Sequence, residues 1–165
     1  MDAILVDAVM ASIDFTIEAL RAVDNDVVVA FHRLLAELGA TTFPSLDTLR
    51  AIVESNSVVV LVARNSGNRM LIGTLTLVMI HTPTGIRARI EDVVVDPVAR
   101  GRGIGEALSR HAIRIATARQ ALTVDLTSKP SREAANRLYL RLGFRRVETN
   151  VYRFTPASGA SGEAG

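Results

Sequence analysis

The sequence predicts one α/β (α+β) domain, and three features of its pattern support that fold class. Apolar residues at helical spacing run from Val27 to Leu38 and, after a capping sequence, from about Pro44 to Glu54. Two apolar, β-branched runs follow, Val58 to Ala63 and Met70 to Ile80, separated by the turn residues Asn65 to Asn68 as in a hairpin. Helical and strand-like patterns then alternate over the rest of the chain.

Length and composition indicate a single hydrophobic core. The chain has 165 residues, of which 48% are hydrophobic and 22% are charged. We therefore expect one domain over residues 1–155. Residues 156–165 are small and polar, and we expect them to form a disordered tail.

The composition also excludes several classes of chemistry and partner. Without cysteine, the chain has no disulfide, thiolate nucleophile or cysteine-based zinc site. Its 19 basic and 17 acidic residues are interspersed and aromatic residues make up 4%, so we expect no nucleic-acid partner. Asp2 and Asp7 stand where a signal peptide is positive, and no apolar run reaches membrane-spanning length. We expect a cytoplasmic protein that makes no contact with a membrane.

Further strands are predicted on both sides of the hairpin. A strand from Ile13 to Leu20 precedes the two helices, and another from Arg87 to Val95 follows the hairpin. Apolar and polar residues alternate from Leu122 to Leu126, as in a half-buried strand. Phe144 to Val147 and Val151 to Phe154 are expected to form a last pair of strands.

Two helices are predicted in the second half of the chain. From Ile104 onward apolar residues recur at helical spacing, so one helix begins near Gly103. Ser131 is expected to cap the other helix, which carries Tyr139 on its apolar stripe and ends at Gly143.

The junction before the first of these helices is richer in glycine and arginine than a turn requires. It contains Arg100, Gly101, Arg102, Gly103 and Gly105. A helix N-terminus offers unpaired N–H groups and a positive dipole end to an anion, and glycines allow a phosphate to reach the backbone. The glycine spacing matches neither the Walker loop nor the dinucleotide-binding fingerprint.

The hexapeptide Arg100-Gly101-Arg102-Gly103-Ile104-Gly105 resembles the acetyl-CoA loop of the GCN5-related N-acetyltransferase (GNAT) superfamily, whose pattern is Gln/Arg-x-x-Gly-x-Gly/Ala. The preceding IEDVVVDP resembles the fourth strand of that family. SREAANRLYLRLGF, Ser131 to Phe144, resembles a later helix of the family with its Asn136 and Tyr139. The resemblance covers the chain from Ile90 to Phe144, in the expected order.

This resemblance implies a fold, a co-substrate and a reaction. The fold would be a mixed, mostly antiparallel twisted sheet of about six to seven strands with about four helices, splayed between strands 4 and 5. The reaction would move an acetyl group from acetyl-CoA, without a metal, to a primary amine by direct attack in a ternary complex. The acceptor could be a small molecule or a protein, and the assembly is left open between a monomer and a homodimer.

The resemblance also implies a set of cofactor contacts. Backbone groups of the fourth strand would pair with the pantetheine arm, and N–H groups of the glycine-rich loop would hold the pyrophosphate. The implied cofactor-binding residues are Val93, Val94, Val95, Arg100, Gly101, Arg102, Gly103, Ile104, Gly105, Glu106, Asn136 and Tyr139.

Attack of an amine on a thioester requires a group that accepts the amine proton and a group that donates to the leaving thiolate. We expect Glu91 to be the base, because strand alternation places it on one face with Val93 and Val95, whereas Asp92 points the other way. Glu91 could instead be a structural partner of Arg87 or Arg89. Tyr139 is the expected acid, since a phenol with a pKa of about 10 stays protonated at neutral pH. It could instead be a core tyrosine.

Several alternatives stay open on the sequence alone. The three histidines lack the spacing of a metal site, and His111 falls on an apolar helix stripe. The acceptor pocket should be formed by Val27 to Phe43 with Thr82 to Arg89, which are mostly apolar. The same fold could also hold acyl-CoA as a sensor or scaffold without turnover.

Overall fold

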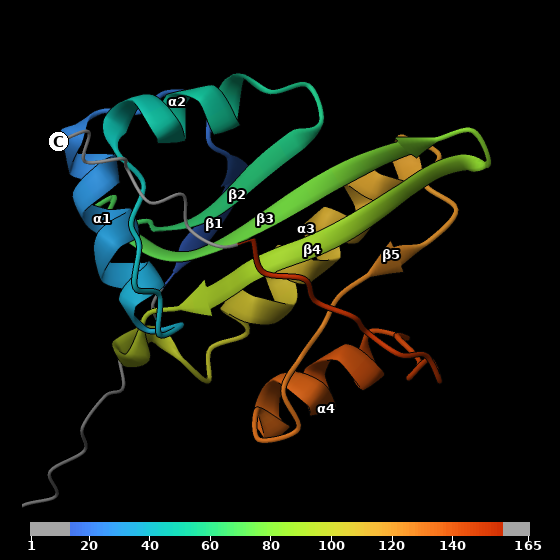
Figure 1. Ribbon diagram of the computed structural model, residues 1–165. Helices are drawn as coiled ribbons and strands as arrows, with labels where there is room; N and C mark the ends of the chain where they lie inside the picture. The colour runs from blue at the N-terminus through green and yellow to red at the C-terminus, as the bar shows by residue number, and fades with distance from the viewer. Residues whose placement is uncertain (1–13, 157–165) are drawn as a thin grey trace, which may run out of the picture.

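The computed structural model describes residues 14–156, which form a five-stranded sheet flanked by helices (Figure 1). The strands follow one another in spatial order, β1 to β4 antiparallel and β5 parallel to β4. The strands are β1 (Phe15–Ala19), β2 (Val58–Asn65), β3 (Leu71–Thr82), β4 (Gly85–Val95) and β5 (Val124–Asp125). The helices are α1 (Asn25–Ala36), α2 (Leu46–Glu54), the 3-10 turn η1 (Pro97–Ala99), α3 (Ile104–Ala118) and α4 (Glu133–Arg141).

The sheet is covered on both faces, and each face has its own apolar cluster. α1 and α2 lie on one side and α3 runs along the other (Figure 1). On the α3 side, Ile104, Leu108 and Ala112 are fully buried against residues of β2, β3 and β4. On the other side, Phe31, Leu34 and neighbouring helix residues pack on Val60, Val62 and Val94. The mixed α/β fold expected from the sequence is confirmed.

Local capping explains where the first two helices begin. The Asp24 side chain accepts a hydrogen bond from the Val27 N–H at 2.9 Å, and Ser45 accepts from the Thr48 N–H at 3.1 Å. The prediction of Ser131 as the cap of α4 is wrong. Arg132 is the N-cap residue and makes no side-chain capping bond, because a turn closed by its N–H on the Lys129 carbonyl delays the helix start.

The expected last pair of strands is absent from the described residues, which hold five strands rather than six to seven. Residues 144–147 and 151–154 lie outside any strand, and Val147, Tyr152 and Phe154 are 72%, 87% and 88% exposed. The physical reason is the shortness of β5, whose two residues offer little backbone for a sixth strand to pair with. Ile13 and the tail beyond residue 156 lie outside the described residues, so the extent of the domain and the disorder of the tail stay predictions.

β4 and β5 separate after a short stretch of pairing. Their register joins Ala88 to Val124 and Arg89 to Asp125, and the backbone bonds on this edge reach back to Ile86 and Leu122. Beyond Arg89, β4 continues for six residues without a strand on that side. The splay between strands 4 and 5 is therefore confirmed.

A β-bulge interrupts β4 at Asp92. Against β3, Thr76 is paired with Glu91 and Thr74 with Val94, so two residues of β4 oppose one of β3. Asp92 has a φ of 51°, in the left-handed region that side chains other than Gly, Asn and Asp rarely adopt.

The bulge overturns the expected alternation along β4. Ile90 and Val93 both pack on the α3-side cluster, whereas Val94 belongs to the α1-side cluster. Glu91 therefore lies on the α1 side of the sheet and does not share a face with Val93 and Val95. Simple period-two counting failed because the extra residue shifts every later side chain to the opposite face.

α1 is anchored to the end of β4 by a charged cluster. The Arg33 guanidinium forms an ion pair with Asp96 and donates to the Leu71 carbonyl at 2.6 Å. The other carboxylate oxygen of Asp96 accepts from the Val98 N–H at 3.1 Å and so caps η1. Asp96 is 8% exposed, and its charge is satisfied from both sides.

We expect Asp96→Ala to lower the free energy of unfolding by about 2 kcal/mol or more, because it removes the cap of η1 and the partner of Arg33. Urea denaturation followed by circular dichroism measures this. The control is Glu133→Ala, which breaks the exposed pair of Glu133 with Arg137 and should change stability by less than about 0.5 kcal/mol. Equal losses in the two variants would contradict the anchoring role of Asp96.

Candidate acyl-transfer site

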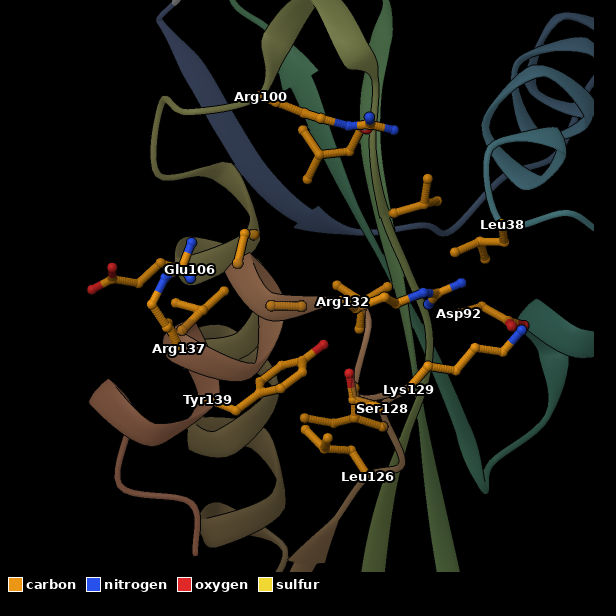
Figure 2. A pocket seen from close by; sticks show the side chains of 18 of the residues that line it. Leu38, Asp92, Arg100, Glu106, Leu126, Ser128, Lys129, Arg132, Arg137 and Tyr139 are labelled. Carbon is orange, nitrogen blue, oxygen red and sulfur yellow. The ribbon is translucent and has the colours of Figure 1, made fainter. Parts of the chain in front are cut away.

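The splay of the sheet opens into a cavity of about 1430 Å³ (Figure 2). Its walls are the second half of β4, the loop and first turn of α3, the segment between β5 and α4, and α4 itself. Glu37 and Leu38, which follow α1, close one end. The cavity therefore joins segments from almost the whole length of the chain.

The glycine-rich loop forms one wall and leaves the start of α3 without a side-chain cap. Gly101 and Gly103 have φ values of 75° and 78°, and no atom lies within 4 Å of where a Cβ would stand on either. Backbone conformation, rather than crowding, therefore requires glycine at both positions. Gly103 is the N-cap of α3 and makes no side-chain capping bond, so the first-turn N–H groups are available to an anion.

The two loop arginines are placed differently from each other. The Arg100 side chain donates to the Val95 carbonyl at 3.1 Å and pairs with Glu37 at 2.9 Å, which ties the loop to the end of α1. Arg100 lines the cavity, whereas Arg102 is not among the residues that line it. Of the other expected cofactor-binding residues, the cavity is lined by Val93, Val94, Val95, Gly101, Gly103, Ile104, Gly105, Glu106 and Tyr139.

Positive charge reaches the cavity mainly from α4 and its flanks. Arg132, Arg137, Arg141 and Arg153 line it, together with Lys129. Arg137 and Arg141, four apart on α4, are 65% and 62% exposed and pair with Glu133 and Glu106, so they form a solvated face that borders the cavity. Packing of α4 beside α3 brings these basic residues opposite the glycine-rich loop, and the sequence alone does not show this.

Tyr139 lies on α4 with its hydroxyl directed into the cavity (Figure 2). Its ring packs edge-on against Phe144, with centroids 5.8 Å apart. Burial raises the pKa of Tyr139 above its usual 10.0, and the nearby Arg132 charge opposes that shift. The phenol is therefore protonated at neutral pH and can donate a hydrogen bond.

Two adjacent carboxylates line the opposite wall. Glu91 forms an ion pair with Arg89, which is the structural partnership that the sequence left open. Asp92 occupies the bulge and also lines the cavity. Desolvation raises the pKa of Asp92 above its ordinary 3.8, and the charge of Glu91 raises it further. Strand alternation predicted that Asp92 points away from this site, and no pattern in the local sequence predicted the bulge.

Asn136 is not among the residues that line the cavity. Its side-chain amide donates to the Lys129 carbonyl at 3.0 Å and to the Pro130 carbonyl at 3.4 Å. Asn136 thus holds the segment that leads into α4. Its expected contact with the cofactor arm stays a prediction.

Within residues 14–156, no group of three or more histidine, cysteine, aspartate or glutamate side chains is arranged to hold a metal ion. Over the same span, no helix is long and apolar enough to cross a membrane. His111, half-buried on α3, contacts Arg114 through its Nδ1 at 2.9 Å.

Comparison with known proteins agrees with this geometry. The model of the acetyltransferase (GNAT) family matches residues 30–144. This chain belongs to the GNAT acetyltransferase family. A curated relative, an uncharacterized N-acetyltransferase of Methanocaldococcus jannaschii, is 43% identical over 61 residues, which are 37% of this acetyltransferase and 27% of the relative.

Solved structures show the same fold. A Trypanosoma brucei acetyltransferase superposes on this acetyltransferase with a TM-score of 0.70 and 26% identity, over 86% of this chain and 100% of that one. An aminoglycoside acetyltransferase from an uncultured soil metagenomic sample, in complex with trehalose, gives a TM-score of 0.75 at 21% identity, over 87% and 97% of the two chains. The expected family, fold class and enzyme class, an N-acetyltransferase, are confirmed.

The raised pKa of Asp92 predicts a stability effect that depends on pH. A carboxyl whose folded-state pKa is raised contributes stability that is full below its unfolded value of 3.8 and is lost as pH rises through the folded value. We expect Asp92→Asn to unfold at the same temperature as wild type or higher at pH 7, and to lose this advantage near pH 3. Asn also tolerates the positive φ of this position.

Thermal melts between pH 3 and pH 7 measure the Asp92 effect. The matched control is Asp125→Asn, which changes a carboxylate outside the cavity lining. A lower melting temperature of Asp92→Asn at pH 7 would show that ionised Asp92 stabilises the free protein, contrary to this prediction.

Proposed function

We propose that this enzyme transfers an acetyl group from acetyl-CoA to a primary amine by direct attack in a ternary complex. One observation carries the proposal: the uncapped start of α3, the free edge of β4 and the Tyr139 hydroxyl line one continuous cavity. An elongated ligand with an anionic end and an amide-bearing arm fits that arrangement. Acetyl-CoA has both, and the family of the chain supports the choice.

In the proposed complex the pyrophosphate lies at the start of α3. The N–H groups from Gly101 to Glu106 would donate to its oxygens, assisted by the dipole of a 15-residue helix. The arginines on α4 would attract the remaining phosphate charge. The pantetheine arm would run along Val93 to Val95 of β4, where no strand occupies the neighbouring position.

Acyl transfer then needs proton movements at two points. The amine nitrogen attacks the thioester carbonyl carbon, the C–S bond breaks, the nitrogen loses a proton and the sulfur leaves as a thiolate. Protonated Tyr139 would donate to that sulfur. Glu91 would take the amine proton, directly or through a water, and Asp92 beside it is the second candidate for this role.

The acceptor would enter where the cavity reaches the end of α1, near Leu38 and Asp92. The aminoglycoside enzyme of similar fold supports a small amine as one candidate class. A protein amine is the other. The cytoplasmic location and the choice between monomer and homodimer also stay predictions.

The test of the function is acetyl transfer to a panel of small amines and peptide N-termini, with products identified by mass spectrometry. We expect acceptor-dependent release of CoA. Tight binding of acetyl-CoA without transfer to any acceptor would favour the sensor or scaffold instead.

Gly103→Val should weaken CoA binding by more than tenfold, because a branched side chain would stand where the backbone meets phosphate. Gly39→Val is a matched control, since Gly39 has a φ of 75°, also has open space around it and does not line the cavity. Both variants should lose similar stability, and only Gly103→Val should lose the thermal shift that CoA produces. Normal CoA affinity in folded Gly103→Val would refute the phosphate assignment.

Tyr139→Phe and Glu91→Gln should lower turnover with different pH profiles. Tyr139→Phe removes the donor and should reduce kcat by about 100-fold at every pH, with CoA affinity nearly unchanged. Glu91→Gln should recover in part at high pH, where more of the amine is already neutral. Steady-state kinetics from pH 6 to pH 10 separate the two. Recovery of Asp92→Asn but not of Glu91→Gln would transfer the base role to Asp92.

A further inference from the structure

Ser128 carries a buried hydroxyl that has no hydrogen-bond partner. Among residues 14–156, no other buried side-chain oxygen or nitrogen lacks a hydrogen-bond partner. Ser128 lies between β5 and α4 and lines the cavity. Its hydroxyl and that of Tyr139 point toward the same part of the cavity (Figure 2).

Hydrogen bonds fix the chain on both sides of Ser128. The Thr127 hydroxyl accepts from Arg89 at 3.5 Å, and the Asn136 amide binds the carbonyls of Lys129 and Pro130. A buried hydroxyl without a partner destabilises a folded protein, since it has lost water and gained nothing in return. A ligand bound in the cavity could supply the missing hydrogen-bond partner, which would explain why the hydroxyl is there.

We propose that Ser128 is a binding residue for the thioester end of the cofactor arm. Its hydroxyl, next to the Tyr139 hydroxyl, donates a hydrogen bond to that end. This inference rests on the proposed function, because it takes acetyl-CoA as the occupant of the cavity. Two hydroxyls then face the reacting end of the arm: that of Ser128, after β5, binds it, and that of Tyr139, on α4, donates to the sulfur as it leaves. The phosphate end is held separately at the start of α3.

The variant Ser128→Ala tests this assignment through three measurements: stability without ligand, affinity for acetyl-CoA without an acceptor, and affinity for adenosine 3′,5′-bisphosphate. The bisphosphate carries nucleotide phosphates but no arm. Without ligand, Ser128→Ala should melt at the wild-type temperature or above it, because it removes an unsatisfied polar group. Acetyl-CoA affinity should fall about 5- to 10-fold, the usual value of one hydrogen bond, and bisphosphate affinity should not change.

Ser109→Ala is the matched control. Ser109 is also buried, but its hydroxyl donates to the Gly105 carbonyl at 2.8 Å and does not line the cavity. Its removal should leave both affinities unchanged.

The outcomes separate this inference from the proposed function. Unchanged acetyl-CoA affinity in Ser128→Ala, with wild type binding acetyl-CoA, overturns the role of Ser128 alone. Equal weakening of acetyl-CoA and bisphosphate binding overturns it as well, because the effect would then come from the shape of the segment. Absence of CoA binding to wild type overturns both proposals.

Discussion

The site depends on β4 losing its neighbour after Arg89. Up to that residue its outer edge is paired with β5, and beyond it the backbone of β4 faces a cavity. Backbone N–H and C=O groups withdrawn from water need partners, and Arg100 supplies one by donating to the Val95 carbonyl. The other groups on that edge are open to a ligand that can act as a strand.

A second constraint acts along β4 itself. The bulge at Asp92 places a residue other than glycine at a φ of 51° and turns Glu91 away from the face that carries Val93 and Val95. Such local strain persists only where the surrounding structure requires it, and it recurs at functional sites. Here it sets two carboxylates at the wall of the cavity, one paired with Arg89 and one partly desolvated.

Charged contacts connect the two ends of the cavity. Arg33 of α1 pairs with Asp96 just before η1, and Glu37 after α1 pairs with Arg100 at the start of the glycine-rich loop. The helix expected to shape the acceptor side is therefore tied to the residue before η1 and to the start of the loop expected to bind phosphate. The Arg100–Glu37 pair is exposed and weak by itself, whereas the Asp96 cluster is largely buried.

Much of this organisation could be predicted from the sequence because it is local. Helical period, the capping sequence before α2 and the glycines before α3 are properties of a few neighbouring residues. The cap of α4 and the last two strands could not be predicted in the same way. The first depends on a turn closed by Lys129, and the second on how far β5 extends as an edge.

The sequence by itself determined the α/β class, the order of the elements and the glycine-rich start of α3, since spacing and backbone preference act within short stretches of chain. Only the tertiary structure decided which carboxylate lines the wall at the bulge, which arginines reach the cavity, and that the Ser128 hydroxyl is buried without a partner. Those outcomes arise from pairing and packing between segments far apart in the chain, and such contacts leave no pattern in the local sequence.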